Sequence, residues 1–413
     1  MSKPMGAIPA GFQSQGGRLL IGGRDAEALA AEAGDTPLFV YDAALVEAKV
    51  ARFRSAFPDI HLHYAIKANS YVPLLRHVAS LVDGLDVASA GEVDMALAAG
   101  TDAGHISFAG PGKRDDELEA ALRSGVTINL ESEGEAERAL AIAARLSLRS
   151  RLAIRVNPDF EIKGSSMRMG GGARPFGIDA DRAAPLARRL IAAGADWRGL
   201  HIFAGSQALA ADSLIEAQAA TLALAATLAH DIGAAPPLLN MGGGFGIPYF
   251  AGEQPLDVEA VGLALTAALP ARDPILKGTR FAIELGRWLV GEAGVYLTRI
   301  VDRKVSHGKT FLITDGGMHH QLAASGNFGQ VIRRNYPVAL PARFDAAPEE
   351  EVSIVGCLCT PLDRLADDVL LPRAEIGDLV AVFLSGAYGL SASPQAFLGH
   401  PPAREILLLP RSG

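Results

Sequence analysis

The stretch that decides the fold, residues 127–156, reads TINL-ESEGEAERALAIAARLSLRS-RLAIRV. A short apolar run, Thr127–Leu130, is followed by Glu133–Arg145, in which Ala and Leu recur at helical spacing, and then by a second apolar run, Arg151–Val156. This order predicts a strand, a helix and another strand, which is the repeating unit of parallel sheets.

The same alternation extends in both directions, from residue 46 to about residue 285. The β-rich runs predict strands at His61–Ile66, Gly84–Val87, His105–Phe108, Thr127–Leu130, Arg151–Val156, Gly199–Phe203, Leu238–Met241 and Arg280–Glu284. Helix-like stretches such as Ala90–Ala99 and Asp115–Arg123 lie between them. Eight strands, each followed by a helix, predict a (β/α)8 TIM barrel over residues 46–285.

The remainder of the chain has a different texture. Strand-like runs there are separated by Gly, Pro and Asp turns with little helix, at Pro37–Tyr41, Val295–Val301, Thr310–Thr314, Glu351–Val355, Leu379–Leu384 and Glu405–Leu408. We therefore expect residues 1–45 and 286–413 to form an antiparallel β domain that takes strands from both ends of the chain.

The composition of the chain limits the classes of protein to which it can belong. With 413 residues, 49% of them hydrophobic and 20% charged, the chain can bury a large core. The net charge of −8 leaves no basic face for nucleic acid. Residues 1–17 lack the apolar run of a signal peptide, and the most apolar stretch, Ala217–Ala229, is shorter than the ~20 residues of a membrane span. We expect a cytoplasmic protein that does not enter the membrane.

In a barrel, functional residues lie at the C-terminal ends of the strands, and Lys67 follows the first predicted strand directly in HYAIKANS, residues 63–70. A lone lysine here is either a solvated loop residue or a partly buried amine that can form an imine. The residue alone leaves both interpretations open.

Two further segments at strand ends carry suitable chemistry. Glycines in Met241–Gly246 (MGGGFG) would let backbone N–H groups converge on an anion, although a tight turn explains them equally well. Glu284 and Arg287 in ELGR have two interpretations. They form a surface ion pair, or they bind a cofactor, with the carboxylate of Glu284 next to a ring nitrogen and the guanidinium of Arg287 on a phosphate. By contrast, Gly110–Lys113 lacks the upstream glycine of a P-loop.

Both cysteines, Cys357 and Cys359, lie in the β domain, so a disulfide framework is excluded. A Cys-x-Cys pair can be a fragment of a metal site, but with only the distant His319 and His320 to help, we expect no metal and two inert thiols. Tyr388 lies on a glycine-flanked turn of the same domain.

Taken together and in this order, these segments resemble the fold-type III pyridoxal-phosphate decarboxylases, the group of diaminopimelate and ornithine/arginine decarboxylases. The resemblance spans nearly the whole chain. Tyr64–Asn69 is similar to the family's cofactor-lysine motif, and Glu284–Arg287 to its Glu-Pro-Gly-Arg motif, with Leu285 in place of proline.

The resemblance implies a pyridoxal 5'-phosphate cofactor and a set of site residues. Lys67 and Cys359 would be catalytic. The cofactor would be held by Lys67, Asp86, Arg155, His201, Phe203, Ser206, Gly243, Gly244, Glu284, Arg287 and Tyr388. The substrate would be held by Arg287, Thr360, Asp363 and Tyr388. It also implies a homodimer in which Cys359 and Asp363 cross the interface.

Two departures from the family pattern concern the substrate. Phe203 stands where the family has a ring-stacking histidine, and His201 comes two positions earlier. Thr360 stands where the family has an acidic residue for the substrate's distal ammonium, and a hydroxyl cannot make that charge-assisted bond. We therefore expect decarboxylation of an amino acid whose distal end is not an amine or is linked to a carrier protein, as in the secondary-metabolite, siderophore and exosortase-associated decarboxylases that the chain resembles.

Three alternatives stay open. Thr360 does not exclude a diaminopimelate decarboxylase of lysine biosynthesis. An amino-acid racemase needs a second base on the opposite ring face, where Cys359 and Asp363 match the decarboxylases better. A pyridoxal-phosphate homeostasis protein would consist of the barrel alone.

The glycine-rich segment Gly164–Gly177, with Arg168 and Arg174, is either a mobile lid or an ordinary exposed loop.

Overall fold

The structure is a computed structural model that describes residues 2–164, 167–168, 170–328, 330 and 332–410. The chain forms two compact units, which are described separately below. Unit 2 comprises Val50–Ile247 and Pro255–Gly286, and unit 1 comprises Met1–Lys49, Pro248–Gln254 and Arg287–Gly413. The expected barrel range, 46–285, therefore includes Pro248–Gln254, which the structure groups with unit 1.

Unit 2 is a closed barrel of eight parallel strands, which confirms the fold predicted from the sequence. Around the barrel the strands are β5 (His61–Ala65), β6 (Gly84–Val87), β7 (Ile106–Phe108), β8 (Thr127–Leu130), β9 (Arg151–Asn157), β12 (Asp196–Ile202), β14 (Leu238–Gly243) and β15 (Arg280–Leu285). The barrel closes where β15 pairs with β5, with Glu284 opposite His63.

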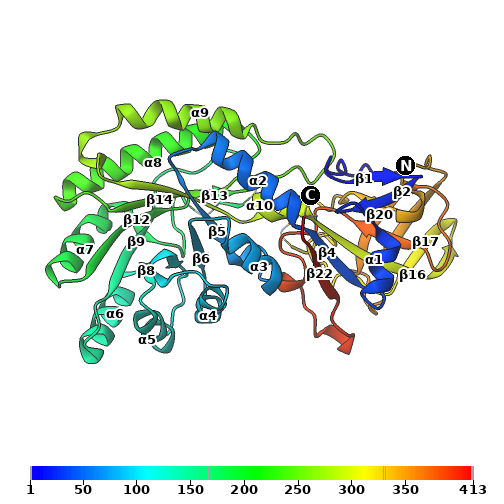
Figure 1. Ribbon diagram of the computed structural model, residues 1–413, viewed down its shortest axis with the longest axis horizontal. Coiled ribbons are helices and arrows are strands. Elements are labelled where there is room, and N and C mark those ends of the chain that lie inside the picture. Colours follow the sequence, from blue (N-terminus) through cyan, green and yellow to red (C-terminus); the bar gives the residue numbers. More distant parts are fainter. Residues whose placement is uncertain (1, 165–166, 169, 329, 331, 411–413) are drawn as a thin grey trace. The chain divides into compact units, whose positions relative to one another are not determined.

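Helices follow the strands and lie outside the barrel (Figure 1). They are α3 (Val72–Ala79), α4 (Ala90–Ala98), α5 (Asp115–Ser124), α6 (Glu133–Leu146), α7 (Ala180–Ala192), α8 (Ala211–Ile232) and α9 (Val258–Ala268), and α2 (Ala43–Ala56) precedes β5. Local chemistry sets their ends. The Ser132 hydroxyl caps α6 by accepting from Glu135 N, and Gly125 ends α5 at φ 74°.

None of the helices in the described part of the chain is long and apolar enough to cross a membrane. The most apolar candidate from the sequence lies within α8, whose buried face includes Leu214, Leu222 and Leu228. Its apolar character therefore reflects packing on the barrel.

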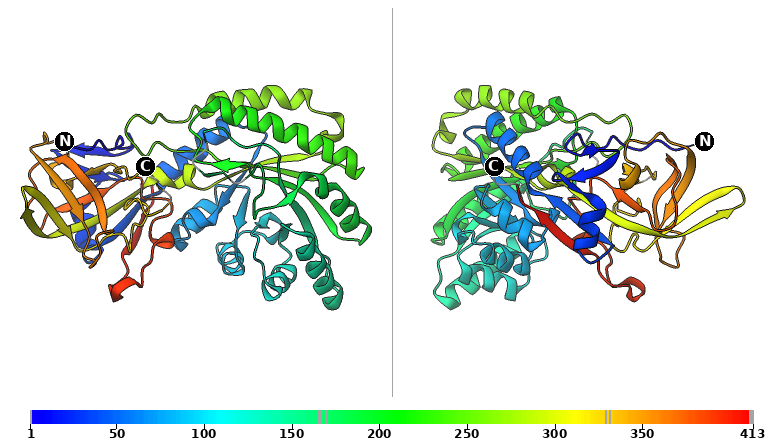
Figure 2. Two further views of the ribbon diagram at one scale, coloured as in Figure 1. Left: turned by 180° about the vertical axis from the view of Figure 1, so that it is seen from behind. Right: turned by 45° about the vertical axis from the view of Figure 1, so that its right-hand side comes forward.

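Unit 1 is built on a mixed sheet. Its strands run in the order β18 (Val338–Ala339), β21 (Leu379–Val382), β16 (Gly294–Ser306), β17 (Lys309–Thr314), β19 (Glu350–Val355) and β20 (Arg364–Leu371), with β4 (Leu38–Asp42) pairing with both β16 and β22 (Arg404–Leu408). The long β16–β17 hairpin is visible in Figure 2. As expected, strands come from both chain ends.

The sheet of unit 1 is not purely antiparallel. β17 pairs with β19 and β22 pairs with β4 in parallel. Parallel neighbours need a long connection. Residues 315–349 connect β17 to β19, and nearly the whole chain lies between β4 and β22. The sequence pattern predicted strands but not their direction. It missed β20 and the small N-terminal sheet of β1 (Gln13–Gln15), β2 (Arg18–Ile21) and β3 (Arg24–Asp25).

Candidate active site

Lys67 lies where the predicted barrel places it, at the C-terminal end of β5, in the short 3-10 turn Ile66–Ala68. The turn is closed by the buried Tyr64 hydroxyl, which donates to Asn69 O at 2.8 Å. Side chains alternate along a strand, so His61, His63 and Ala65 share one face and Leu62 and Tyr64 the other. The Lys67 side chain is about half exposed (46%) and is therefore open to reagents.

Glu284 is the charged neighbour of Lys67. Its Oε1 lies 3.9 Å from Lys67 Nζ, and its side chain is buried near the end of β15. Burial raises the pKa of Glu284, but contact with His201 and the charges of Lys67 and Arg155 outweigh that effect and lower the pKa to about 2. The barrel therefore holds a buried carboxylate that is ionised at neutral pH.

His201 and Phe203 form the wall beside these two groups. His201 Nε2 lies 3.1 Å from Glu284 Oε2, and both side chains are buried. The His201 and Phe203 rings meet edge to face at 6.5 Å, and Lys67 Nζ lies 5.8 Å from the Phe203 ring centre. The departure from the family pattern at Phe203 therefore belongs to the surroundings of Lys67.

A second charged pair, His63 and Asp86, lies in the same barrel. His63 Nδ1 is 3.3 Å from Asp86 Oδ2, and both side chains are buried. Burial lowers the pKa of His63, but the contact with Asp86 and the nearby negative charges, Glu284 among them, outweigh burial, so the net shift of the pKa is upward. Sequence reasoning assigned Asp86 a role but missed His63, although strand alternation places it on one face with His61 and Ala65.

Arg155 on β9 is held by Glu131, which the sequence analysis did not single out. Arg155 Nη1 donates to Glu131 Oε1 at 2.8 Å, and the same carboxylate accepts from the backbone of Gly110 and Gly177. Burial raises the pKa of Glu131, but the positive charges of Arg155 and Lys113 outweigh it and lower the pKa. Arg155 thus lies in a buried ionic network.

Lys113 belongs to this network and not to a phosphate-binding loop. Its ammonium donates to Glu135 at 2.6 Å and to two backbone carbonyls, those of Gly110 and Asn129. All three N–H groups of the ammonium therefore have protein acceptors. This agrees with the exclusion of a P-loop at Gly110–Lys113.

The glycines at the C-terminal end of β14 are required by close backbone approach. A Cβ on Gly243 would lie 1.9 Å from Glu284 O, and one on Gly244, where φ is +80°, would lie 2.4 Å from Gly205 O. Ser206 follows Gly205, and its hydroxyl is buried with no hydrogen-bond partner among the described residues. An unpaired buried hydroxyl next to a glycine cradle fits a group with strong acceptor oxygens, such as a phosphate.

Arg287 and Tyr388 belong to unit 1, where they meet each other. The Arg287 guanidinium lies 4.6 Å from the centre of the Tyr388 ring, and Nη1 donates to Tyr249 Oη at 2.9 Å. Burial lowers the pKa of Arg287, but the two tyrosines outweigh it and raise the pKa. Tyr249 was missed because nothing in the surrounding sequence distinguishes it from a core aromatic residue.

Asp363 fixes the Gly356–Asp363 loop of unit 1. Its buried carboxylate accepts from Met318 N at 2.6 Å and from Leu358 N at 2.8 Å. Cys359 is exposed and Thr360 half-buried on the same loop. The structure therefore gives Asp363 a loop-holding role, and its expected contact with substrate stays a prediction.

Part of the Gly164–Gly177 segment lies outside the described residues, namely Ser165, Ser166 and Met169, and so do the side chains of Met167 and Arg168. The backbone of β10 (Met167–Arg168) pairs with β13 (Gly205–Ser206). This pairing places the segment against the Ser206 turn, and whether it acts as a lid stays a prediction.

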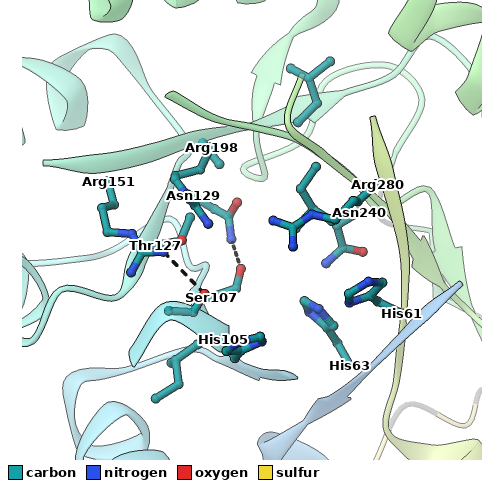
Figure 3. Close-up of a pocket in the computed structure, with 15 residues that line it drawn as sticks. His61, His63, His105, Ser107, Thr127, Asn129, Arg151, Arg198, Asn240 and Arg280 are labelled. Atoms are coloured by element: carbon teal, nitrogen blue, oxygen red, sulfur yellow. Dashed lines mark hydrogen bonds between the residues drawn. The ribbon is translucent and has the colours of Figure 1, made fainter. Parts of the chain in front are cut away.

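A cavity of about 240 Å³ lies at the opposite, N-terminal end of the barrel (Figure 3). Arg151, Arg198 and Arg280 contribute to its lining, and the first two share Asp196, each at 3.7 Å. Since catalytic residues of barrels lie at the other end, we assign no part of the chemistry around Lys67 to this cavity.

Comparison with known proteins places these features in a family context. The family model of the pyridoxal-dependent decarboxylases, pyridoxal binding domain, matches residues 43–291. An L-glutamyl–BtrI acyl-carrier protein decarboxylase of Niallia circulans is 41% identical over 90% of this chain and 89% of its own. The diaminopimelate decarboxylase of Methanothermobacter thermautotrophicus is 32% identical over 95% of this chain and 91% of its own.

Solved structures give the same picture. Diaminopimelate decarboxylase from M. jannaschii in complex with L-lysine superposes with a TM-score of 0.87 at 25% identity, over 97% of this chain and 93% of that one. The Helicobacter pylori enzyme with L-lysine has a TM-score of 0.80 at 28% identity, over 93% and 94% of the two chains.

Proposed function

Because the chain belongs to the family of pyridoxal-dependent decarboxylases, it is a pyridoxal phosphate-dependent carboxy-lyase, and we propose that its substrate is an amino acid linked to a carrier protein through its distal end. The observation that carries the chemistry is the contact of Lys67 with the buried, ionised Glu284. The substrate assignment rests on the residues of the Gly356–Asp363 loop.

The residues of unit 2 fit the cofactor. Lys67 offers an accessible amine for its aldehyde, and Phe203 offers an apolar ring face beside that amine. The unpaired Ser206 hydroxyl and the backbone of Gly243 and Gly244 would hold the phosphate. When bound, the cofactor accepts the electron pair that the departing carboxylate leaves on the α-carbon.

Glu284 would hold a proton at the ring nitrogen. A carboxylate whose pKa is lowered to about 2 stays ionised, and an anion beside a ring nitrogen favours the protonated ring. His201, in contact with the other oxygen of Glu284, would keep the carboxylate oriented toward that nitrogen. We assign Arg287 and Tyr388 to the phosphate and the substrate, and Cys359 to returning a proton to the α-carbon.

The Gly356–Asp363 loop argues against a free distal amine. Asp363 is the only acidic residue in this loop, and its two oxygens already accept backbone N–H groups of Met318 and Leu358. Thr360 offers only a neutral hydroxyl. Thr360 therefore cannot make the charge-assisted bond that the distal ammonium of a free diamino acid would need.

A carrier-linked glutamate satisfies these constraints. Decarboxylation needs a free α-amine and a free α-carboxylate, so a carrier protein can hold glutamate only through its distal carboxylate. The relative from Niallia circulans, 41% identical, is named for an L-glutamyl group on an acyl-carrier protein. The distal end of such a substrate carries no ammonium, which agrees with the neutral hydroxyl of Thr360 in place of an acidic side chain.

The substrate assignment is tested by measuring CO2 release from three compounds: L-glutamate linked through its distal carboxylate to a carrier protein, free L-glutamate and free meso-diaminopimelate. We expect the linked amino acid to have by far the highest kcat/KM. Rapid turnover of free diaminopimelate at micromolar KM would overturn the proposal and make the chain a diaminopimelate decarboxylase. Loss of optical activity without CO2 release would indicate a racemase.

We also infer a homodimer in a reducing compartment such as the cytoplasm. The dimer rests on the resemblance, in which the loop that carries Cys359 reaches across to the partner's cofactor, and on the exposure of Cys359 in the single chain. The compartment rests on the two cysteines, both of which are free thiols.

A further inference from the structure

Three side chains with metal-binding atoms meet in unit 1, at the base of the loop that carries Cys359 and Thr360. They are His319, Cys357 and His400, and one ligand atom from each lies within 4.8 Å of the other two. Cys357 Sγ is 3.8 Å from His400 Nδ1, and the His319 and His400 rings are 5.3 Å apart between centres. The three residues come from separate segments, so only the fold brings them together.

His319 supplies the second, independent sign of a ligand. Its side chain is fully buried, and neither ring nitrogen has a hydrogen-bond partner among the described residues. A neutral imidazole carries one donor and one acceptor, and burying both unpaired is unfavourable. A bound cation would satisfy the acceptor nitrogen.

The distances are suited to a tetrahedral ion. Zinc–nitrogen bonds of about 2.0 Å and zinc–sulfur bonds of about 2.3 Å place tetrahedral ligand atoms about 3.5 Å apart. Small rotations of the side chains would bring atoms now within 4.8 Å to that spacing. Imidazole and thiolate ligands together select zinc over magnesium or calcium, which prefer oxygen.

The neighbouring candidates for a fourth ligand are already engaged. His320 has its Nδ1 3.1 Å from Tyr296 Oη and its Nε2 2.9 Å from Pro401 O. Asp363 accepts two backbone N–H groups. A fourth position would therefore be open to water.

We propose that His319, Cys357 and His400 form a zinc site with three protein ligands. The ion would tie together the turn at Met318–His320, the Gly356–Asp363 loop and the segment around His400. Because Cys357 lies two residues before Cys359, the ion would also hold the loop that presents Cys359 and Thr360. The sequence alone led us to expect no metal, because Cys357 was paired with Cys359 and His319 with His320. The fold instead brings one residue of each pair, Cys357 and His319, together with His400.

The test is the metal content of the full-length enzyme, purified without a histidine tag, incubated with Zn²⁺, then dialysed and measured by inductively coupled plasma mass spectrometry. We expect about one zinc per chain. Cys357→Ser and His400→Ala should each lower the content several-fold, while the matched controls Cys359→Ser and His307→Ala, at exposed positions, should retain it. Zinc-free wild-type enzyme, or equal loss in Cys359→Ser, would overturn the assignment.

Cobalt substitution gives a second readout, and its wild-type measurement does not depend on the stability of a variant. Wild-type enzyme loaded with Co²⁺ should show thiolate-to-metal charge-transfer absorption together with the intense visible bands of four-coordinate cobalt. Both should persist in Cys359→Ser, and the charge-transfer absorption should vanish in Cys357→Ser. Wild-type spectra of octahedral cobalt without the charge-transfer absorption would contradict the proposal.

Discussion

At the scale of single residues, two buried carboxylates of this chain have different roles. Glu284 is buried and ionised beside an amine and an imidazole. Asp363 is also buried, but its oxygens are bound by backbone N–H groups, which gives it a structural role. Residue type alone does not separate these roles, because the partners of each carboxylate define them.

Replacing Glu284 by Gln keeps the shape and removes the charge. We expect kcat for decarboxylation to fall about a hundredfold, because a neutral amide stabilises the protonated ring much less than a carboxylate does. Glu259→Gln is the matched control, since Glu259 is exposed and pairs with Arg52. Unchanged kcat in Glu284→Gln, measured by CO2 release, would remove Glu284 from the chemistry.

The charge of Glu284 should also show in the pH dependence of stability. Its pKa is lowered in the folded protein from 4.5 to about 2. The stabilisation is therefore fully present above the unfolded value and is lost as the pH falls toward 2. We expect the free energy of unfolding of wild type, relative to Glu284→Gln, to decrease between those pH values in urea titrations. A difference that is constant with pH, or increases on acidification, would contradict this.

At the scale of elements, a strand and the turn after it act together. β5 brings His61, His63 and Ala65 to one face by alternation, and the Tyr64–Asn69 hydrogen bond closes the turn that carries Lys67. β14 and β15 approach so closely that only glycine fits at position 243. The site is thus built from strand ends whose backbones are fixed by their neighbours.

Gly243→Ala should destabilise the barrel. The new methyl group would lie 1.9 Å from Glu284 O, and overpacking of this kind costs about 1–3 kcal/mol of unfolding free energy. Gly278→Ala is the control, because a Cβ there meets nothing within 4 Å and the backbone needs no positive φ. Chemical denaturation of both variants measures the difference. Equal stability of the two would show that the strands can move apart without penalty.

At the scale of the whole molecule, the two units divide the expected roles. Unit 2 contains Lys67 and Glu284, and unit 1 contains Cys359, Thr360 and the Arg287–Tyr388 contact. In the proposed dimer, Lys67 and Cys359 of one site come from different chains. That arrangement predicts complementation between inactive variants.

Lys67→Ala and Cys359→Ala should each be nearly inactive, and refolding them together should restore about a quarter of wild-type activity, because half of randomly mixed dimers would contain one intact site. CO2 release measures the recovery. Mixing each variant with wild type in the same way provides the control for refolding yield. If the mixture remained as inactive as its components, both residues would have to act within one chain.

Local pattern was sufficient for much of this protein. Alternating apolar runs and helical stretches predicted all eight barrel strands, and the motifs around Lys67 and Glu284 predicted the family, because strand period, turn residues and motif order are encoded in neighbouring residues. Thr360 supports the proposed substrate class for a different reason, since the identity of a side chain limits the charge that it can recognise.

Other features were decided only by the tertiary structure. Contacts between residues far apart in sequence determine the parallel pairing of β22 with β4, the engagement of Asp363 by Met318, and the pairing of His63 with Asp86. The meeting of His319, Cys357 and His400 is of the same kind. Burial and the distance between side chains set pKa values and possible ligands, and both arise only when the chain has closed on itself.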